Sequence, residues 1–380
     1  MAHAPKHEIL SGALVDYVGN FITNSNHFYF KWIIMRHELI QQSPSRLTTI
    51  VNQLRTQSSS KHFEFLSPSD HGLDAILAIH DVEYIEYLKS AYKEWCEEGG
   101  NKNGVIPEAF PHSGFTSVSR DKIKNLKSSI AKAGLYCFDL SCCITEETWD
   151  AVYESAQIGI SAAKELIKLN NESVCDKGHP LGVFALCRPP GHHANSKISG
   201  GGCFLNNAAI TAKLLINNLD SNGSARKVVI LDIDYHHGNG TQDIFYSQSN
   251  PLYVSLHASN DYPWFTGEVT EIGEGEGEGY NVNIPLPEET SDEIYCELLE
   301  KVIKERIIPY GANYLLVSLG VDTYKDDPIG GFQMTTDVYK RIGRIIKSIE
   351  LPTLFVMEGG YYMETLGINV TNVLLGFMDN

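Results

Sequence analysis

Two aspartates and a histidine at alternating positions are the strongest chemical signal in the chain. The segment reads Asp232-Ile-Asp-Tyr-His236, and residues two apart in an extended segment point to the same side. Carboxylates and imidazoles are ligands that Zn²⁺ accepts, and a catalytic zinc keeps one position open beside three protein ligands. We expect Asp234 and His236 to supply two ligands and Asp322 the third. The same set would also accept iron or cobalt.

Two adjacent histidines, His192 and His193, are candidates for proton transfer because imidazole titrates near neutral pH. Adjacent imidazoles titrate as a coupled pair, so one ring is neutral when the other is charged. Asp232 and Asn239 are candidates to orient the two rings through hydrogen bonds. Metal ligation and a buried structural role are the alternatives for the histidine pair.

A tyrosine follows a glycine pair in Glu358-Gly-Gly-Tyr361. Its hydroxyl could donate to the oxyanion that develops when a carbonyl is attacked. A packed aromatic residue beside a glycine turn explains the same spacing equally well. The spacing alone therefore leaves the role of Tyr361 open.

Short apolar, β-branched runs alternate with amphipathic stretches of helical period along the chain. Strand–helix–strand repetition predicts an α/β fold, in which one mostly parallel sheet is covered by helices on both faces. The predicted strands are residues 182–187, 227–234, 252–257, 314–322 and 352–360, and the predicted helices are residues 146–169, 203–219, 291–308 and 336–348.

The candidate residues lie at the carboxyl ends of the predicted strands. Ligands of open parallel sheets bind outside these ends. We therefore expect five strand ends to meet at one site. The residues at these ends are, in chain order, His193, Asp234, His257, Asp322 and Tyr361.

Composition narrows the function and the location. A formal net charge of −17 disfavours nucleic acid as a ligand and suits cations such as polyamines or lysine-rich protein tails. Eight cysteines without a C-x-x-C pair indicate reduced thiols. We find no secretory signal and no apolar run of about 18 residues, so we expect a cytoplasmic protein without a membrane span.

Residues 1–44 are the least regular stretch, which favours an N-terminal arm or an oligomer contact in a homo-oligomer. The remaining residues, 45–380, are long and apolar enough for one large domain. Within it, residues 98–133 form the longest stretch without a clear element, which is typical of a functional loop.

Four segments together form a highly specific set of motifs. They are Arg188-Pro-Pro-Gly-His-His-Ala194, Asp232-Ile-Asp-Tyr-His-His-Gly-Asn-Gly-Thr-Gln242, Leu319-Gly-Val-Asp-Thr323 and Glu358-Gly-Gly-Tyr361. In this order they resemble the histone deacetylase and acetylpolyamine amidohydrolase family. The resemblance covers residues 45–378 and implies the single-domain arginase-deacetylase fold with one zinc ion per chain.

The resemblance also implies a reaction, which is hydrolysis of an N-acetyl amide to acetate and a free amine. It makes His192 and His193 the general acid/base pair, and Tyr361 the residue that polarises the acetyl carbonyl. It further implies a monovalent cation, potassium, near the zinc. The residues implied for the zinc are Asp234, His236 and Asp322, and those implied for potassium are Asp232, Asp234, His236, Ser255 and Leu256.

The family lines its substrate tunnel with two aromatic residues, and this sequence departs from that pattern. Tyr262 matches one of them, but Gly202 stands at the other position, so we expect one wall to be missing. Ile329 stands where a polyamine-selective relative has a glutamate. Ile130, in the basic stretch 122–132, lies near the place of an acidic loop residue. These departures favour acetyl-lysine in a protein tail over an acetylpolyamine.

Three functions therefore compete. The first is a lysine deacetylase that acts on protein tails, histones included, and the second is an acetylpolyamine amidohydrolase. The third is an acetyl-lysine reader without activity, against which the metal ligands, the histidine pair and Tyr361 argue. Glu108 and Asp139 could supply rim carboxylates, but we interpret both as ordinary surface groups.

Overall fold

The computed structural model describes residues 30–33, 43–57, 63–112, 125–172 and 181–379. Over these residues eight strands form one sheet in the order β2-β1-β3-β8-β7-β4-β5-β6, and each neighbouring pair is parallel. The strands are β1 (Phe30–Ile33), β2 (Glu64–Leu66), β3 (Gly182–Ala185), β4 (Val228–Asp232), β5 (Leu252–Ala258), β6 (Asn281–Leu286), β7 (Tyr314–Leu319) and β8 (Thr353–Met357).

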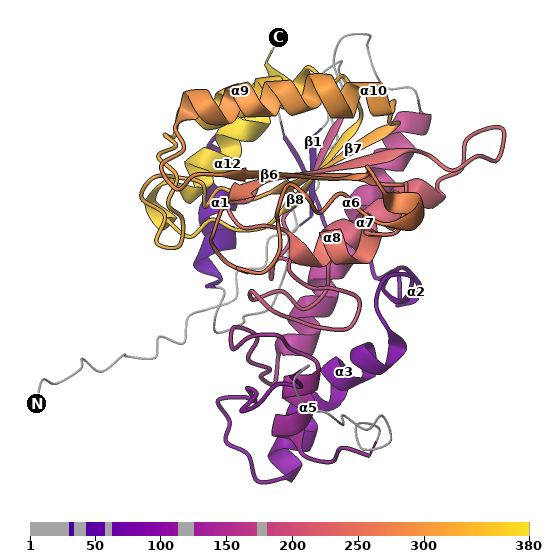
Figure 1. Cartoon of the computed structure of the whole chain (residues 1–380), viewed down its shortest axis with the longest axis vertical. Helices are drawn as coiled ribbons and strands as arrows, with labels where there is room; N and C mark the ends of the chain where they lie inside the picture. The colour runs from indigo at the N-terminus through magenta and orange to yellow at the C-terminus, as the bar shows by residue number, and fades with distance from the viewer. Residues whose placement is uncertain (1–29, 34–42, 58–62, 113–124, 173–180, 380) are drawn as a thin grey trace, which may run out of the picture.

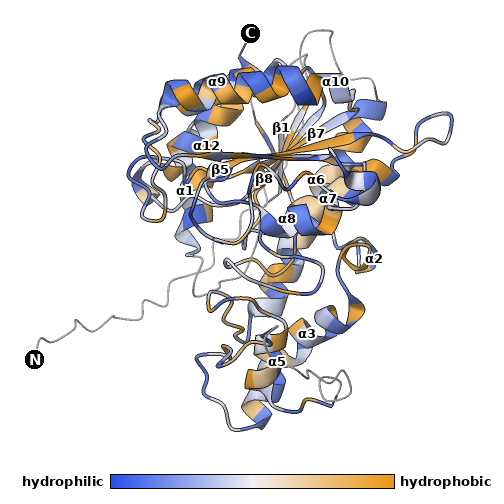
Figure 2. Cartoon of the chain, in the orientation of Figure 1, coloured by the Kyte–Doolittle hydropathy of each residue, from blue (hydrophilic) through white to orange (hydrophobic). Residues whose placement is uncertain are grey.

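The central strands are buried on both faces, which explains their continuous apolar sequences. Every residue of β3, β4, β7 and β8 is buried. Successive residues alternate between two cores, since Val229 and Leu231 belong to one apolar cluster and Val228 and Ile230 to another. Apolar residues accordingly dominate the strands at the centre of the molecule (Figure 2).

Helices cover both faces of the sheet (Figure 1). Residues of α1, α9, α11 and α12 pack into the first core, whereas α6 and α7 pack into the second. A third apolar cluster joins α3 and α5 to α6 in the part of the molecule that extends away from the sheet. The helices are α1 (Ser45–Gln57), α2 (Asp74–Leu77), α3 (Val82–Glu97), α5 (Ser129–Leu135), α6 (Thr148–Asn171), α7 (Asn207–Asn217), α8 (Asn239–Phe245), α9 (Asp292–Val302), α10 (Ile308–Tyr310), α11 (Val338–Lys347) and α12 (Met363–Met378).

Helix α11 illustrates why these elements form where they do. Val338, Ile342 and Ile345 recur at helical spacing and are buried in the first core. Arg341 and Arg344 point to the opposite, exposed face. The helix therefore packs its apolar stripe into the first core, beside α12, and keeps its charges in water.

The predicted α/β fold is confirmed, since each predicted strand and helix is present with its ends moved by a few residues. Strand β6 was not predicted because its polar Asn281 and Asn283 alternate with apolar residues. Both asparagines are buried, and each donates to the side-chain oxygen of Gln242 at 2.8 Å. Among the described residues, we find no helix with both the length and the apolar character to cross a membrane.

The segment 1–44, which we expected to be irregular, contains β1 between β2 and β3 of the sheet. Residues 1–29 and 34–42 lie outside the described part of the chain, so the boundary at residue 45 stays a prediction. The expected loop 98–133 is irregular up to residue 112, and its end forms the start of α5. Its residues 113–124 also lie outside the described part.

Candidate metal centre and active site

Asp234, His236 and Asp322 lie together beyond the carboxyl ends of β4 and β7, which are neighbours in the sheet. One ligand atom of each residue lies within 4.8 Å of the other two. Nδ1 of His236 is 3.4 Å from Oδ1 of Asp234 and 3.3 Å from Oδ2 of Asp322. All three side chains are buried. The pairing of the two strands thus unites residues that are far apart in sequence.

The chemistry of this group fits a divalent cation. Burial and the nearby charge of Asp234 raise the pKa of Asp322 to about 7. The buried Oδ2 of Asp322 has no hydrogen-bond partner in the described part of the chain. A cation between the two carboxylates would supply the positive charge that their burial requires. Two carboxylates and one imidazole leave a zinc ion an open position for substrate or water.

Backbone amides orient the two carboxylates. Gly359 N–H donates to Oδ2 of Asp234 at 2.8 Å, and Tyr235 N–H donates to Oδ1 of Asp322 at 3.0 Å. A Cβ atom at Gly359 would lie 2.2 Å from Oδ2 of Asp322. This close approach explains why glycine stands at position 359 of the tyrosine motif, and the two amides fix the orientation of the carboxylates.

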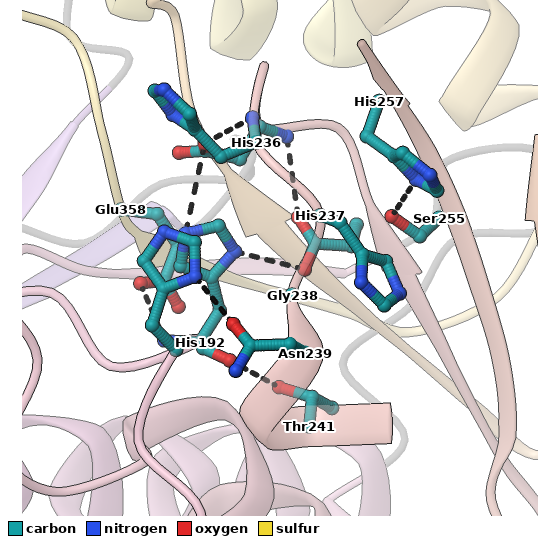
Figure 3. Close-up of polar contacts among 12 residues, drawn as sticks. His192, His236, His237, Gly238, Asn239, Thr241, Ser255, His257 and Glu358 are labelled. Carbon is teal, nitrogen blue, oxygen red and sulfur yellow. Dashed lines mark hydrogen bonds and ion pairs between the residues drawn. The ribbon is translucent and has the colours of Figure 1, made fainter. Parts of the chain in front are cut away.

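The two adjacent histidines lie beside this group, after β3. Their ring centroids are 4.0 Å apart, and the ring of His193 is 6.0 Å from that of His236. Nδ1 of His192 is 3.2 Å from Oδ2 of Asp232, and Nδ1 of His193 is 2.8 Å from Oδ1 of Asn239. The structure thus brings each histidine to the residue that we expected to orient it, and Figure 3 shows Asn239 beside His192.

Electrostatics set the two histidines to different protonation states, with His192 charged and His193 neutral. Burial lowers the pKa of His192, but the carboxylates of Asp234 and Asp232 outweigh burial and raise that pKa to about 10. Burial, together with the positive charges of His192 and His236, holds the pKa of His193 well below its usual value. His193 is therefore neutral at neutral pH, and since its Nδ1–H donates to Asn239, its Nε2 is free to accept a proton.

Glu358 ties the histidine loop to the end of β8 (Figure 3). Its Oε2 accepts from Gly191 N–H at 2.7 Å and from His192 N–H at 3.2 Å. The side chain is fully buried, and this burial raises its pKa to about 8. Glu358 was predicted only as part of the tyrosine motif, and the structure shows that it joins that motif to the histidine pair.

Arg46 and Asp327 hold the segment that carries Tyr361. Arg46, buried in α1, donates to the carbonyl oxygens of Glu358 at 2.7 Å and Gly360 at 2.8 Å. Its guanidinium carbon lies 4.7 Å from the centroid of the Tyr361 ring. Oδ2 of Asp327 accepts from Tyr361 N–H at 2.7 Å. Sequence reasoning missed Arg46, because one arginine in an amphipathic helix normally indicates a solvated face.

Ser255 and Leu256, which we expected near a monovalent cation, lie in β5 beside β4. Ser255 is opposite Asp232 in the register, and its Oγ is 2.9 Å from Nδ1 of His257. Nε2 of His257 lies 3.0 Å from the carbonyl oxygen of Gly267. His257 thus pairs with Ser255 and a loop instead of joining the metal group (Figure 3). Contacts therefore join the ends of β3, β4, β7 and β8, whereas the hydrogen bonds of His257 lead to its own strand and a loop. The place of the Tyr361 hydroxyl at the site stays a prediction.

Of the three predicted tunnel residues, Tyr262 packs against the rings of His193 and His236. Its ring stands edge-on to His193, with centroids 4.9 Å apart, and to His236, with centroids 5.9 Å apart. Gly202 is half-buried, and its N–H donates to a serine hydroxyl. Ile329 is 49% exposed. The structure therefore places Tyr262 against the rings of His193 and His236, and Ile329 at the surface.

Asp139 is not the ordinary surface group that we expected. It is half-buried, and its carboxylate accepts from Gly201 N–H at 2.9 Å, from Tyr262 O–H at 2.6 Å, and from both N–H and O–H of Ser141. Glu108, which we also interpreted as an ordinary surface group, is exposed as expected. Asp139 therefore joins three loops beside the histidine pair.

Gly201 lies directly against the ring of His193. Its φ is +60°, and a Cβ atom would lie 2.2 Å from Cδ2 of His193. We expect Gly201→Ala to displace the ring and to lower kcat by about a hundredfold, since a misplacement of about 1 Å can have that effect. Zinc content should be unchanged. Steady-state kinetics and metal analysis of the purified variant measure both quantities.

Gly223→Ala is the matched control, because Gly223 also has a positive φ of +80° but a Cβ atom there would meet nothing within 4 Å. Both variants place a Cβ atom on a residue with positive φ. Equal kcat values for the two would contradict the role of His193.

An α/β fold with a buried Asp–His–Asp group and a histidine pair at one edge of its parallel sheet defines a class of metal-dependent hydrolases. The family model of the histone deacetylase domain matches residues 40–377, and the chain belongs to this family. It is therefore an amidohydrolase of the deacetylase type, with a buried group that can hold a metal ion.

Several relatives resemble the chain over most of its length. Acetylpolyamine amidohydrolase 1 of Pseudomonas aeruginosa is 39% identical over 338 residues, which cover 88% of this chain and 91% of that protein. The acetylpolyamine amidohydrolase of Mycoplana ramosa is 38% identical, over 82% of this chain and 86% of that protein. The crystal structure of acetylpolyamine aminohydrolase from Burkholderia pseudomallei superposes with a TM-score of 0.78 at 33% identity, and covers 92% of this chain and 98% of that one.

Proposed function

We propose that the protein is a zinc-dependent acetylpolyamine amidohydrolase, which releases acetate and a free amine from N-acetylated polyamines. The observation that carries the proposal is the buried group of Asp234, His236 and Asp322 beside the neutral imidazole of His193. A zinc ion in this group would act as a Lewis acid toward the amide carbonyl and toward water.

The residues of the chain have separate tasks in this proposal. Nε2 of His193 accepts the proton of the attacking water and returns it to the leaving amine. His192, charged and bonded to Asp232, fixes the position of its neighbour and adds positive charge near the oxyanion. The hydroxyl of Tyr361 donates to the carbonyl oxygen as its negative charge grows.

We also propose a monovalent cation, potassium, near Asp232, Asp234, His236, Ser255 and Leu256. Asp232 is fully buried, which favours a compensating positive charge close to its carboxylate. Burial raises its pKa, and the charge of His192 opposes that shift. The neighbouring backbone carbonyls of β5 are the type of oxygen ligand that potassium prefers.

Similarity favours the polyamine substrate over acetyl-lysine, contrary to our weighting of the sequence departures. Four relatives named acetylpolyamine amidohydrolase are 36–39% identical and match 82–90% of this chain. Three relatives named histone deacetylase are 33–34% identical and match 57–62% of it. The argument from Ile130 is wrong, because this residue packs against the third apolar cluster as part of α5 and takes no loop position.

Two carboxylates near the active site support a cationic substrate. Asp261 precedes Tyr262 and accepts from the hydroxyl of Tyr235 at 2.8 Å. Glu288 is exposed and packs against Gly331. Gly331 also lies beside the Tyr235 hydroxyl, because a Cβ atom added to it would be 2.9 Å from that oxygen. Together with the net charge of −17, these groups would attract the free ammonium of a polyamine.

Acetate release from a panel of acetylated amines tests the proposal. Zinc-loaded protein is given acetylputrescine, acetylspermidine and an acetyl-lysine peptide, and metal content is measured on the same sample. We expect kcat/KM to be at least about tenfold higher for the polyamines, which corresponds to about 1.4 kcal/mol of transition-state binding. A preference for the peptide would instead indicate a lysine deacetylase, and binding without acetate release would indicate a reader.

A further inference from the structure

Phe138 continues the aromatic surface of Tyr262 away from the histidines. The two rings are nearly parallel, at 24°, with centroids 6.3 Å apart. Exposure rises in order along this row, since His193 is 4% exposed, Tyr262 is half-buried and Phe138 is 36% exposed. A chain that extends outward from the reaction centre along Tyr262 would therefore meet Phe138 next.

The backbone holds Phe138 firmly in this place. Its N–H donates to the carbonyl oxygen of Ser199 at 2.9 Å, and Ser199 N–H donates to the carbonyl oxygen of Tyr136 at 2.9 Å. A Cβ atom at Gly200 would lie 2.1 Å from the Phe138 ring. The Phe138 ring thus lies against Gly200 of the glycine run, two residues before Gly202, the position at which the expected second aromatic residue is missing.

Asp139 anchors the same surface through its four hydrogen bonds to Gly201, Ser141 and Tyr262. It also lies within 4.8 Å of the thiols of Cys137 and Cys142, a group that could hold a metal. Oδ2 accepts two hydrogen bonds, and Oδ1 accepts two from Ser141 and a longer one of 3.9 Å from the Cys137 thiol. A metal ligand would have to give these up. Its bonds therefore indicate a positioning residue that fixes Tyr262 and the loop of Phe138.

We propose that Phe138 is a substrate-contacting residue, held by Asp139, that packs against the methylene chain of the acetylated amine outside Tyr262. The inference rests on the proposed function, because it assumes that the acetyl group reaches the metal past Tyr262. Apolar contact with an aromatic ring is non-directional, so Phe138 selects a flexible aliphatic chain and leaves recognition of charge to other groups.

Two hydroxamates that differ in chain length test this assignment by binding to zinc-loaded protein in a calorimeter. Acetohydroxamate reaches only the metal, whereas octanohydroxamate also extends a chain along the aromatic surface. We expect Phe138→Ala to weaken octanohydroxamate about tenfold through lost apolar contact, and to leave acetohydroxamate unchanged. Asp139→Asn, which perturbs the anchor without changing side-chain size, should show the same split between the two ligands.

Leu140→Ala is the matched control, because Leu140 lies two residues from Phe138 in the same loop and is 61% exposed. It should change neither affinity. If Phe138→Ala and Leu140→Ala bind octanohydroxamate equally well, the assignment of Phe138 is overturned while the proposed function stands. If the wild-type protein binds neither hydroxamate, the proposed function is overturned and the inference with it.

Discussion

Asp322→Ala should lose zinc and acetate release together. Asp322 supplies one of three expected ligands, and two ligands cannot hold the ion against dialysis. Replacing a residue that only supports a ligand typically lowers metal affinity by about 10–100-fold, and loss of a direct ligand should exceed that range. Metal analysis after dialysis and an acetate assay measure the two effects on one preparation.

The control for this variant is Asp326→Ala, because Asp326 is an exposed aspartate four residues further on. It should keep both zinc and activity. Thermal unfolding with and without added zinc shows whether each variant is folded. A folded Asp322→Ala protein that retains one zinc ion per chain would contradict the assigned metal centre.

Tyr361→Phe should keep zinc and lose most of kcat. Removal of one donor to a developing oxyanion typically lowers kcat by about 10²–10³-fold, or about 2.7–4 kcal/mol. The expected change in KM is small, because the hydroxyl acts mainly in the transition state. Steady-state kinetics with the best substrate of the panel measure kcat and KM separately.

Tyr362→Phe removes the same hydroxyl from the adjacent residue, where it donates to Glu364 at the surface. This variant should have normal kinetics. Near-normal kcat in Tyr361→Phe, with zinc present, would rule out the oxyanion role and leave Tyr361 as a packed aromatic residue. The comparison therefore decides between the two interpretations that the spacing left open.

The sheet and the site at the carboxyl ends of its strands could be predicted from the sequence, because the patterns that indicate them involve residues close together in sequence. The alternation of Asp232, Asp234 and His236 follows from extended geometry, and the apolar runs before them follow from burial on both faces. Predicting the site did not require the order of the strands in the sheet, because the carboxyl ends of all parallel strands lie at the same edge. That is why Asp322, from a distant strand, could be paired with Asp234.

Contacts between distant loops could not be predicted in this way. Phe138 and Asp139 lie in an irregular segment, and only the fold reveals that they meet Tyr262 and the glycine run. Gly202 indicated a missing wall, but it carries no information on which other segment fills the space. The contacts of Arg46 could not be predicted either, because it donates to backbone carbonyl oxygens. Every residue has such an oxygen, so the sequence does not indicate which one Arg46 contacts.

The bond from Arg46 to Gly360 links positions that are 314 residues apart. A ribosome must therefore synthesise all the residues between them before the loop of Tyr361 can pack against α1. Contacts of such long range form late, after the segments between them have collapsed. Nascent chains that stop short of this loop should remain catalytically silent however well their other strands have folded, so turnover begins only after the loop of Tyr361 has been made.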